Sequence, residues 1–62
     1  MGMKIRVARV TKQLTINELA RRVDVTPQYI SDIERGRAKN PSIALLRRIA
    51  KELDISISQL ID

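Results

Sequence analysis

Apolar residues recur at helical spacing along most of the chain, and the clearest stretch lies in its middle. Leu19 and Val23 are four residues apart, on one face of a helix. Ile30 and Ile33 form the apolar side of a second helix a few residues later. Ala20 is small enough to let the two helices cross closely. The pattern predicts two short helices with a brief turn between them.

The turn is marked by residues that start a helix. Thr26 is a good N-cap, because its hydroxyl can accept a hydrogen bond from an unpaired backbone N–H. Pro27 follows at the first helical position, where its missing N–H costs nothing. Gly36 then stops the second helix. Helix, short turn and helix make a helix-turn-helix motif, which we expect at about residues 16–35.

Three further helices complete the prediction. The first covers Lys4–Lys12, and another follows Ser42 with apolar residues at i, i+3, i+4 and i+7. A last short helix opens at Ser56 and runs through Ile61, as the spacing of a capping box indicates, with Ile57 and Leu60 facing inward. We therefore expect an all-α fold, a compact bundle of about five short helices in one domain over residues 1–62.

The composition limits the classes of function. A chain of 62 residues buries only about 60% of its unfolded surface, so the core is thin and leaves little room for a substrate cavity. There is no Cys for a disulfide or a thiolate metal site. No apolar run approaches the roughly 18 residues of a membrane span. We expect a cytoplasmic protein without membrane association, metal, cofactor or small-molecule substrate.

Catalytic chemistry finds no support in the sequence. There is no His, which is the usual proton shuttle and metal ligand, and no Cys nucleophile. Asp32 and Glu34 are two residues apart and point to different helix faces, so they do not form an acid–base pair. We expect that the protein is not an enzyme.

The net charge of +5 is unevenly distributed. Residues 1–40 hold nine Lys or Arg and four Asp or Glu, whereas residues 41–62 hold three of each kind. A one-sided basic surface attracts polyanions, although a charge of this size also serves solubility. Charge alone does not separate a nucleic-acid-binding protein from an ordinary soluble domain.

The polar side of the second helix of the motif carries residue types that read bases. The major groove of B-DNA is about 12 Å wide and admits one α-helix. Gln28 can pair with N6 and N7 of adenine, and Asp32 can accept a hydrogen bond from N4 of cytosine. Ser31 can donate or accept, and Thr26 offers a hydroxyl near the groove wall.

Cations follow this helix directly. Arg35, Arg37 and Lys39 are placed to contact a phosphate strand, and such contacts set position and affinity rather than sequence. Asn17, near the start of the first helix of the motif, can join backbone N–H groups in binding a phosphate. Each of these side chains taken alone is also compatible with an ordinary exposed surface.

These residues resemble the Cro/C1-type helix-turn-helix repressor family over nearly the whole chain. The resemblance is carried by LTINELA (residues 14–20), YISDIERG (residues 29–36) and NPSI (residues 40–43). It implies a lambda-repressor-like bundle whose third helix reads the major groove, and a homodimer on a palindromic operator. By position, Pro27 joins the base-reading residues and Asn40 joins the backbone-contacting loop. Arg9 matches a first-helix arginine that pairs with the glutamate at the position of Glu34.

Four positions depart from the family pattern. Ile16 stands where the family often has a Gln that anchors the third helix and a phosphate, so this contact is in question. Gln13, Asp24 and Asp54 replace frequent glycines at the ends of helices. A left-handed backbone at a non-Gly residue costs roughly 1–2 kcal/mol, and less for Asp. Either these turns differ from the family's or stability is given up.

We predict a sequence-specific double-stranded DNA-binding transcriptional regulator, most simply a repressor that occupies its operator as a homodimer. The dimer surface is expected first at Leu60, Ile61 and the exposed side of the last helix, and second at Val7 and Val10. A protein–protein interaction module on the same fold is the alternative, mildly favoured by Ile16. An idealised bundle without function would avoid non-Gly residues at costly turns. The chain can also be a piece of a longer protein whose C-terminal part dimerises or senses a ligand.

Overall fold

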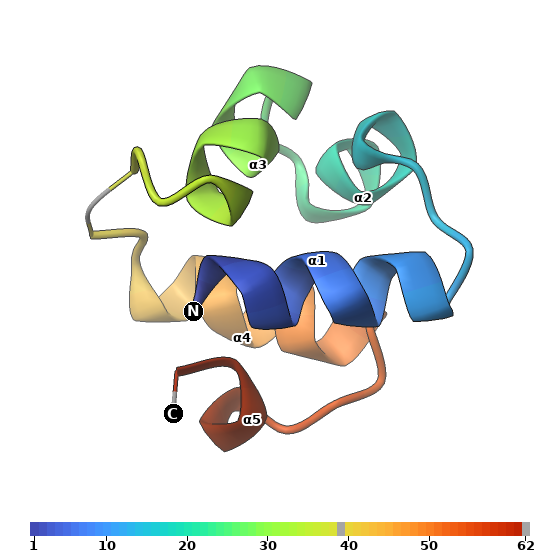
Figure 1. Cartoon of the computed structure of the whole chain (residues 1–62), viewed down its shortest axis with the longest axis vertical. Helices are drawn as coiled ribbons and strands as arrows, with labels where there is room; N and C mark the ends of the chain where they lie inside the picture. Colours follow the sequence, from blue (N-terminus) through green and yellow to red (C-terminus); the bar gives the residue numbers. More distant parts are fainter. Residues whose placement is uncertain (39, 62) are drawn as a thin grey trace.

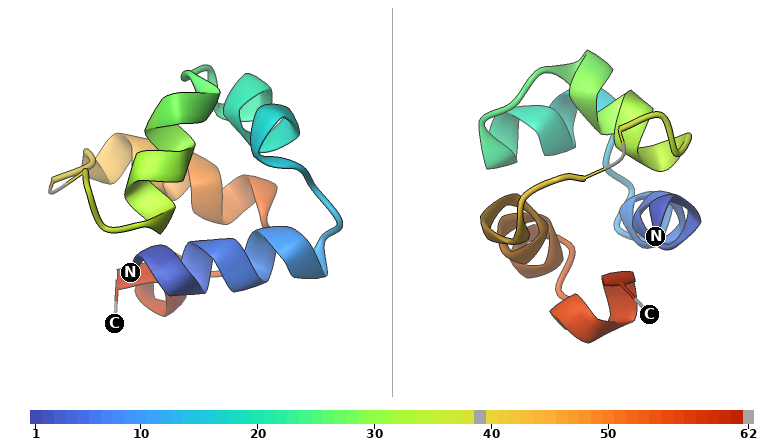
Figure 2. Two further views of the ribbon diagram at one scale, coloured as in Figure 1. Left: turned by 45° about the horizontal axis from the view of Figure 1, so that its top comes forward. Right: turned by 90° about the vertical axis from the view of Figure 1, so that its left-hand side faces the viewer.

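Five short α-helices build the structure, a computed structural model that describes residues 1–38 and 40–61. The helices are α1 (Gly2–Thr11), α2 (Ile16–Val23), α3 (Pro27–Glu34), α4 (Ile43–Glu52) and α5 (Ile57–Ile61). α1 and α4 lie at the middle level, with α2 and α3 on one side of them and α5 on the other (Figures 1 and 2). The prediction of an all-α bundle is confirmed, although the first helix begins at Gly2 rather than at Lys4. None of the helices described is long and apolar enough to cross a membrane.

Side chains cap the starts of α2 and α3, and Thr15 and Glu18 have the S/T-x-x-E spacing that predicts a capping box. The Thr15 hydroxyl accepts from the Glu18 backbone N–H at 3.0 Å, and the Glu18 carboxylate accepts from the Thr15 N–H at 2.8 Å. This second bond holds the pKa of the Glu18 carboxyl below its usual 4.5, with a smaller contribution from the Thr15 hydroxyl. Thr26 caps α3 by accepting from the backbone N–H of Tyr29 at 3.1 Å. α2 and α3 therefore begin at residues that the local sequence determines.

The core is a single apolar cluster to which every helix contributes. Ala20 of α2 is 1% exposed and belongs to this cluster. Leu60 is 0% exposed, so its expected place on a dimer surface is wrong: this side chain anchors α5 to the core. Ile61, by contrast, is 52% exposed. The buried apolar residues are Ile5, Leu19, Ala20, Val23, Ile30, Ile33, Leu45, Leu46, Ile49, Ala50, Leu53 and Leu60.

Three helix ends adopt a left-handed backbone without glycine. The φ angles are 60° at Gln13, 61° at Asp24 and 59° at Asp54. The turns therefore keep the conformation that glycine would favour. Of the two alternatives, a different turn or a loss of stability, the backbone angles therefore favour the second. The left-handed conformation costs roughly 1–2 kcal/mol at a residue such as Gln13 and less at Asp.

Gly2 sets how closely α1 approaches the end of α3. A Cβ added to Gly2 would lie 2.5 Å from the carbonyl oxygens of both Ile33 and Glu34. Both atoms belong to the backbone, which cannot rotate away as a flexible side chain can. Nothing in the sequence indicates this contact, because a glycine at the second position looks like part of a mobile terminus.

Gly2→Ala is expected to lower the free energy of unfolding by about 1–3 kcal/mol, because the new methyl group forces α1 away from α3. Denaturant unfolding followed by circular dichroism measures the loss. Lys4→Ala is the matched control, since Lys4 is exposed on the same turn, and it should change stability by less than about 0.5 kcal/mol. Equal stability of Gly2→Ala and the unmodified chain would show that the first turn of α1 does not fix α3.

Candidate nucleic-acid interface

α3 lies at the edge of the molecule with one face packed on the core and the other turned outward (Figure 2). Ile30 and Ile33 hold the inner face and are 0% and 1% exposed. On the outer side Gln28 and Arg35 are exposed, and Ser31 and Asp32 are half-buried. The helix has 8 residues and is about 12 Å long, so it is a short rigid rod that presents a polar edge.

A hydrogen bond links the two principal candidates for reading bases. Gln28 Nε2 donates to Asp32 Oδ1 at 3.0 Å, across one turn of α3. A carboxylate only accepts hydrogen bonds, so Asp32 determines which end of the Gln28 amide faces it. The Gln28 Oε1 and the second N–H on Nε2 can still form hydrogen bonds with another partner.

The chain after α3 folds back onto the end of that helix. The carbonyl oxygen of Asp32 accepts from the backbone N–H of Arg37 at 2.8 Å and of Ala38 at 3.2 Å. Arg35, Arg37 and Asn40 are exposed there, and the predicted contact residue Lys39 lies outside the described residues. The structure thus gathers the described cations of this loop at the C-terminal end of α3.

The remaining predicted contact residues lie at the N-terminal ends of α2 and α3. Thr26 and Pro27 are exposed at the start of α3, and Asn17 is exposed at the start of α2. Ile16 is half-buried and packs against the core instead of presenting a polar group.

Arg9 and Glu34 form a nearly buried ion pair that ties α1 to the end of α3. The Arg9 Nε lies 2.7 Å from Glu34 Oε2, and Nη2 lies 3.2 Å from Oε1. The third contact is a 2.7 Å hydrogen bond from Nη1 to the carbonyl oxygen of Leu14, in the turn before α2. The side chains of Arg9 and Glu34 are only 11% and 5% exposed. One guanidinium thus holds α1, the start of the motif and α3 in a fixed relation.

Arg6 lies beside this outer face and was not among the predicted contact residues. It lines a small crevice together with Ser31 of α3 and with Arg35, the residue that follows this helix. Arg6 precedes Arg9 by three residues and therefore shares its side of α1. This spacing was visible in the sequence, but only the packing of α1 against α3 shows that Arg6 borders the motif.

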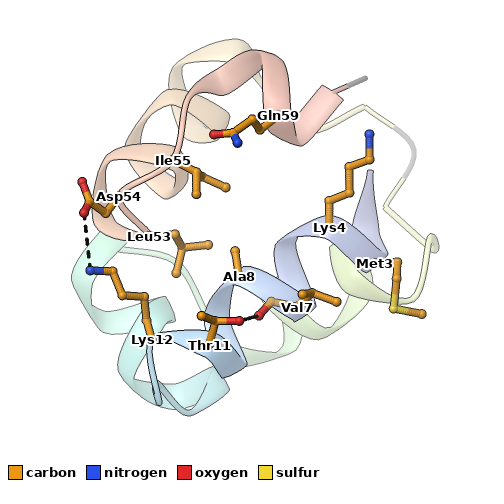
Figure 3. A pocket seen from close by; sticks show the side chains of 10 residues that line it. All are labelled: Met3, Lys4, Val7, Ala8, Thr11, Lys12, Leu53, Asp54, Ile55 and Gln59. Atoms are coloured by element: carbon orange, nitrogen blue, oxygen red, sulfur yellow. Dashed lines mark hydrogen bonds and ion pairs between the residues drawn. The ribbon is translucent and has the colours of Figure 1, made fainter.

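A larger open groove lies on the other side of α1 (Figure 3). Its volume is about 610 Å³, which is more concave space than the length of the chain led us to expect. The Lys12 Nζ and the Asp54 Oδ2 pair at 3.7 Å at one end. Within the described residues, His, Cys, Asp and Glu form no cluster of three or more that could hold a metal ion. The walls are formed by Met3, Lys4, Val7, Ala8, Thr11, Lys12, Leu53, Asp54, Ile55 and Gln59.

Comparison with known proteins gives consistent matches over this whole fold. Residues 5–60 match a family model described as helix-turn-helix. The HTH-type transcriptional regulator SinR of Bacillus subtilis (strain 168) is 37% identical over 62 residues, which are 100% of this chain and 56% of SinR. Control protein C.BamHI of Bacillus amyloliquefaciens is 37% identical over 62 residues, covering 98% of this chain and 75% of that protein.

A solved structure matches equally well. The crystal structure of SinR, the master regulator for biofilm formation, in complex with DNA has a TM-score of 0.92 and 38% sequence identity. The match covers 98% of this chain and 97% of the chain in that structure. In sequence, this chain spans about half the length of two curated relatives: 56% of SinR and 41% of SlrR from the same organism.

Proposed function

The chain belongs to the Cro/C1-type helix-turn-helix family, a family of transcriptional regulators rather than enzymes, and from this membership we propose that it binds double-stranded DNA sequence-specifically and regulates transcription. The observation that carries the proposal is the outer face of α3. Polar side chains line this face, cations gather at its end, and Ile30 and Ile33 hold it rigidly from behind. The proposal places the protein in the cytoplasm with the DNA that it regulates.

In this proposal, α3 enters the major groove and Gln28 makes the principal base contact. Its free Oε1 and N–H match the donor at N6 and the acceptor at N7 of adenine. Asp32 orients this amide and can itself accept from cytosine N4. Thr26, Pro27 and Ser31 lie beside them and contact the neighbouring bases.

Phosphate contacts complete the interface on both sides of α3. They hold the helix in register and supply affinity that does not depend on the base sequence. The residues proposed for this role are Asn17, Arg35, Arg37, Lys39 and Asn40.

We further propose that the protein acts as a repressor, as a homodimer on a palindromic operator. The longest Cα extent of the chain is 24 Å, whereas two half-sites on one side of B-DNA are about 34 Å apart. One copy therefore reaches one half-site, and two copies related by a two-fold axis reach both. A dimer bound in this way occupies the operator and excludes polymerase.

The second copy is the partner that we propose for the exposed apolar surface of α1. Met3 is 64% exposed, and Val7 and Val10 are each 57% exposed. Their spacing of four and three residues is the spacing at which one helix packs along another. Ile61 at the end of α5 is the other exposed apolar candidate. Sedimentation of Val7→Asp and Ile61→Asp distinguishes the two surfaces, because only the variant in the interface becomes monomeric.

A protein–protein interaction module remains the alternative from another class. It would leave the basic residues of the α3 face without a role, and it would explain the half-buried Ile16 equally well. The charge distribution favours DNA, because the entire excess of five positive charges lies in residues 1–40.

Binding to random-sequence duplexes, followed by selection and sequencing, tests the proposal directly. We expect a selected consensus and a logarithm of the binding constant that falls linearly with the logarithm of salt concentration. Arg37→Gln should weaken binding to all sequences alike, as expected for a phosphate contact. Absence of both a consensus and a salt dependence would favour the interaction module.

A further inference from the structure

A small crevice opens where α1, the start of α2 and α3 meet, at the border of the outer face of α3. Its volume is about 90 Å³. A liquid water occupies about 30 Å³ and organic ligands fill sites of roughly 300–1,000 Å³, so the space suits a small ion or a single functional group. The crevice is lined by Arg6, Arg9, Ile16, Ser31, Glu34 and Arg35.

The charges around this crevice do not cancel. Arg9 and Glu34 neutralise each other, and their contacts use both carboxylate oxygens and three guanidinium nitrogens. Arg6 and Arg35 are left, and no ion pair to either is formed within residues 1–38 and 40–61. Two guanidinium groups at one small opening, one from α1 and one from the residue after α3, attract an oxyanion, and their planar N–H pairs match the oxygens of a phosphate.

We propose that this crevice binds one phosphate of the DNA backbone, held between Arg6 on α1 and Arg35 directly after α3. The inference rests on the proposed function and adds α1 to the DNA-binding surface. Ser31 lines the crevice with a hydroxyl, and α2 begins at Ile16, where the positive end of the helix dipole favours an anion. Arg6 thus supplies a phosphate contact next to Ile16, whose apolar side chain cannot bind a phosphate.

Arg6→Gln tests the proposal against Arg48→Gln, which removes another exposed arginine, from α4. Both variants lower the net charge by one, so a difference between them reports a local contact. On a duplex selected by the unmodified chain, Arg6→Gln should weaken binding about three- to tenfold and make the salt slope shallower by about 0.9. Arg48→Gln should bind almost as the unmodified chain does, and both should keep its melting temperature.

Replacing single phosphates by uncharged methylphosphonates locates the contact. At one position in each half-site the replacement should weaken duplex binding by the unmodified chain but not by Arg6→Gln, because that variant has already lost the interaction. If Arg6→Gln matches Arg48→Gln in affinity and salt slope, or if no phosphate couples to Arg6, the inference is wrong while DNA binding stands. If the unmodified chain binds no duplex, the proposed function itself fails.

Discussion

Replacing Arg9 by Met is expected to lower the free energy of unfolding by about 3–5 kcal/mol, the cost of leaving one partner of a buried ion pair alone. Glu34 is 5% exposed, so its carboxylate would lose two N–H donors without gaining water. For the 62 residues of this chain the total stability is roughly 3–9 kcal/mol. If the unmodified chain has a stability near the lower end of that range, the variant should therefore be largely unfolded.

Thermal and urea unfolding measure this effect, and two controls assign it. Arg6→Met removes an exposed arginine from the same helix and should change stability by less than about 0.5 kcal/mol. The double variant Arg9→Met/Glu34→Leu leaves no charge buried, and it should regain most of the loss. If the double variant is as unstable as Arg9→Met alone, then packing around the long side chains, and not the unpaired charge, causes the loss.

The local elements of the fold followed from the sequence because the signals that define them are local. The capping box of Thr15 and Glu18, and Thr26 before Pro27, start α2 and α3 wherever those helices lie in space. The apolar spacing likewise identified Ile30 and Ile33 as the inner face of α3. Residues that act within one or two helical turns were therefore predictable.

Contacts between distant segments could not be found in this way. Arg9 and Glu34 are 25 positions apart, and only the family resemblance suggested that they pair. Gly2 and Arg6 gave no local sign of their neighbours on α3, since nothing in the residues of α1 shows which helix packs against it. Leu60 was misplaced on the dimer surface although its spacing of three residues from Ile57 had already put both on the inward side of the last helix, and the structure bears out that inward side for Leu60.

Gln28→Ala is expected to remove the preference for adenine at one base pair of each half-site. A bidentate pair between an amide and adenine contributes about 1–3 kcal/mol of discrimination, so the preference should fall by a factor of roughly 5 to 160. Selection of random duplexes by the variant measures this change directly. Because the Gln28 side chain is exposed, folding should not change. An unaltered consensus would exclude Gln28 from base reading.

Asp32→Asn should raise the affinity for DNA and, like Gln28→Ala, reduce the preference for adenine. The variant removes a negative charge from a surface that faces phosphates, so binding to every duplex should become tighter. Asn can donate as well as accept, so it no longer determines which end of the Gln28 amide faces it, and the preference for adenine should fall about three- to tenfold. Tighter binding with an unchanged consensus would show that the 3.0 Å bond between Gln28 and Asp32 does not orient the amide on DNA. A weaker affinity together with a lost preference at a cytosine would instead identify Asp32 as a base-reading residue in its own right.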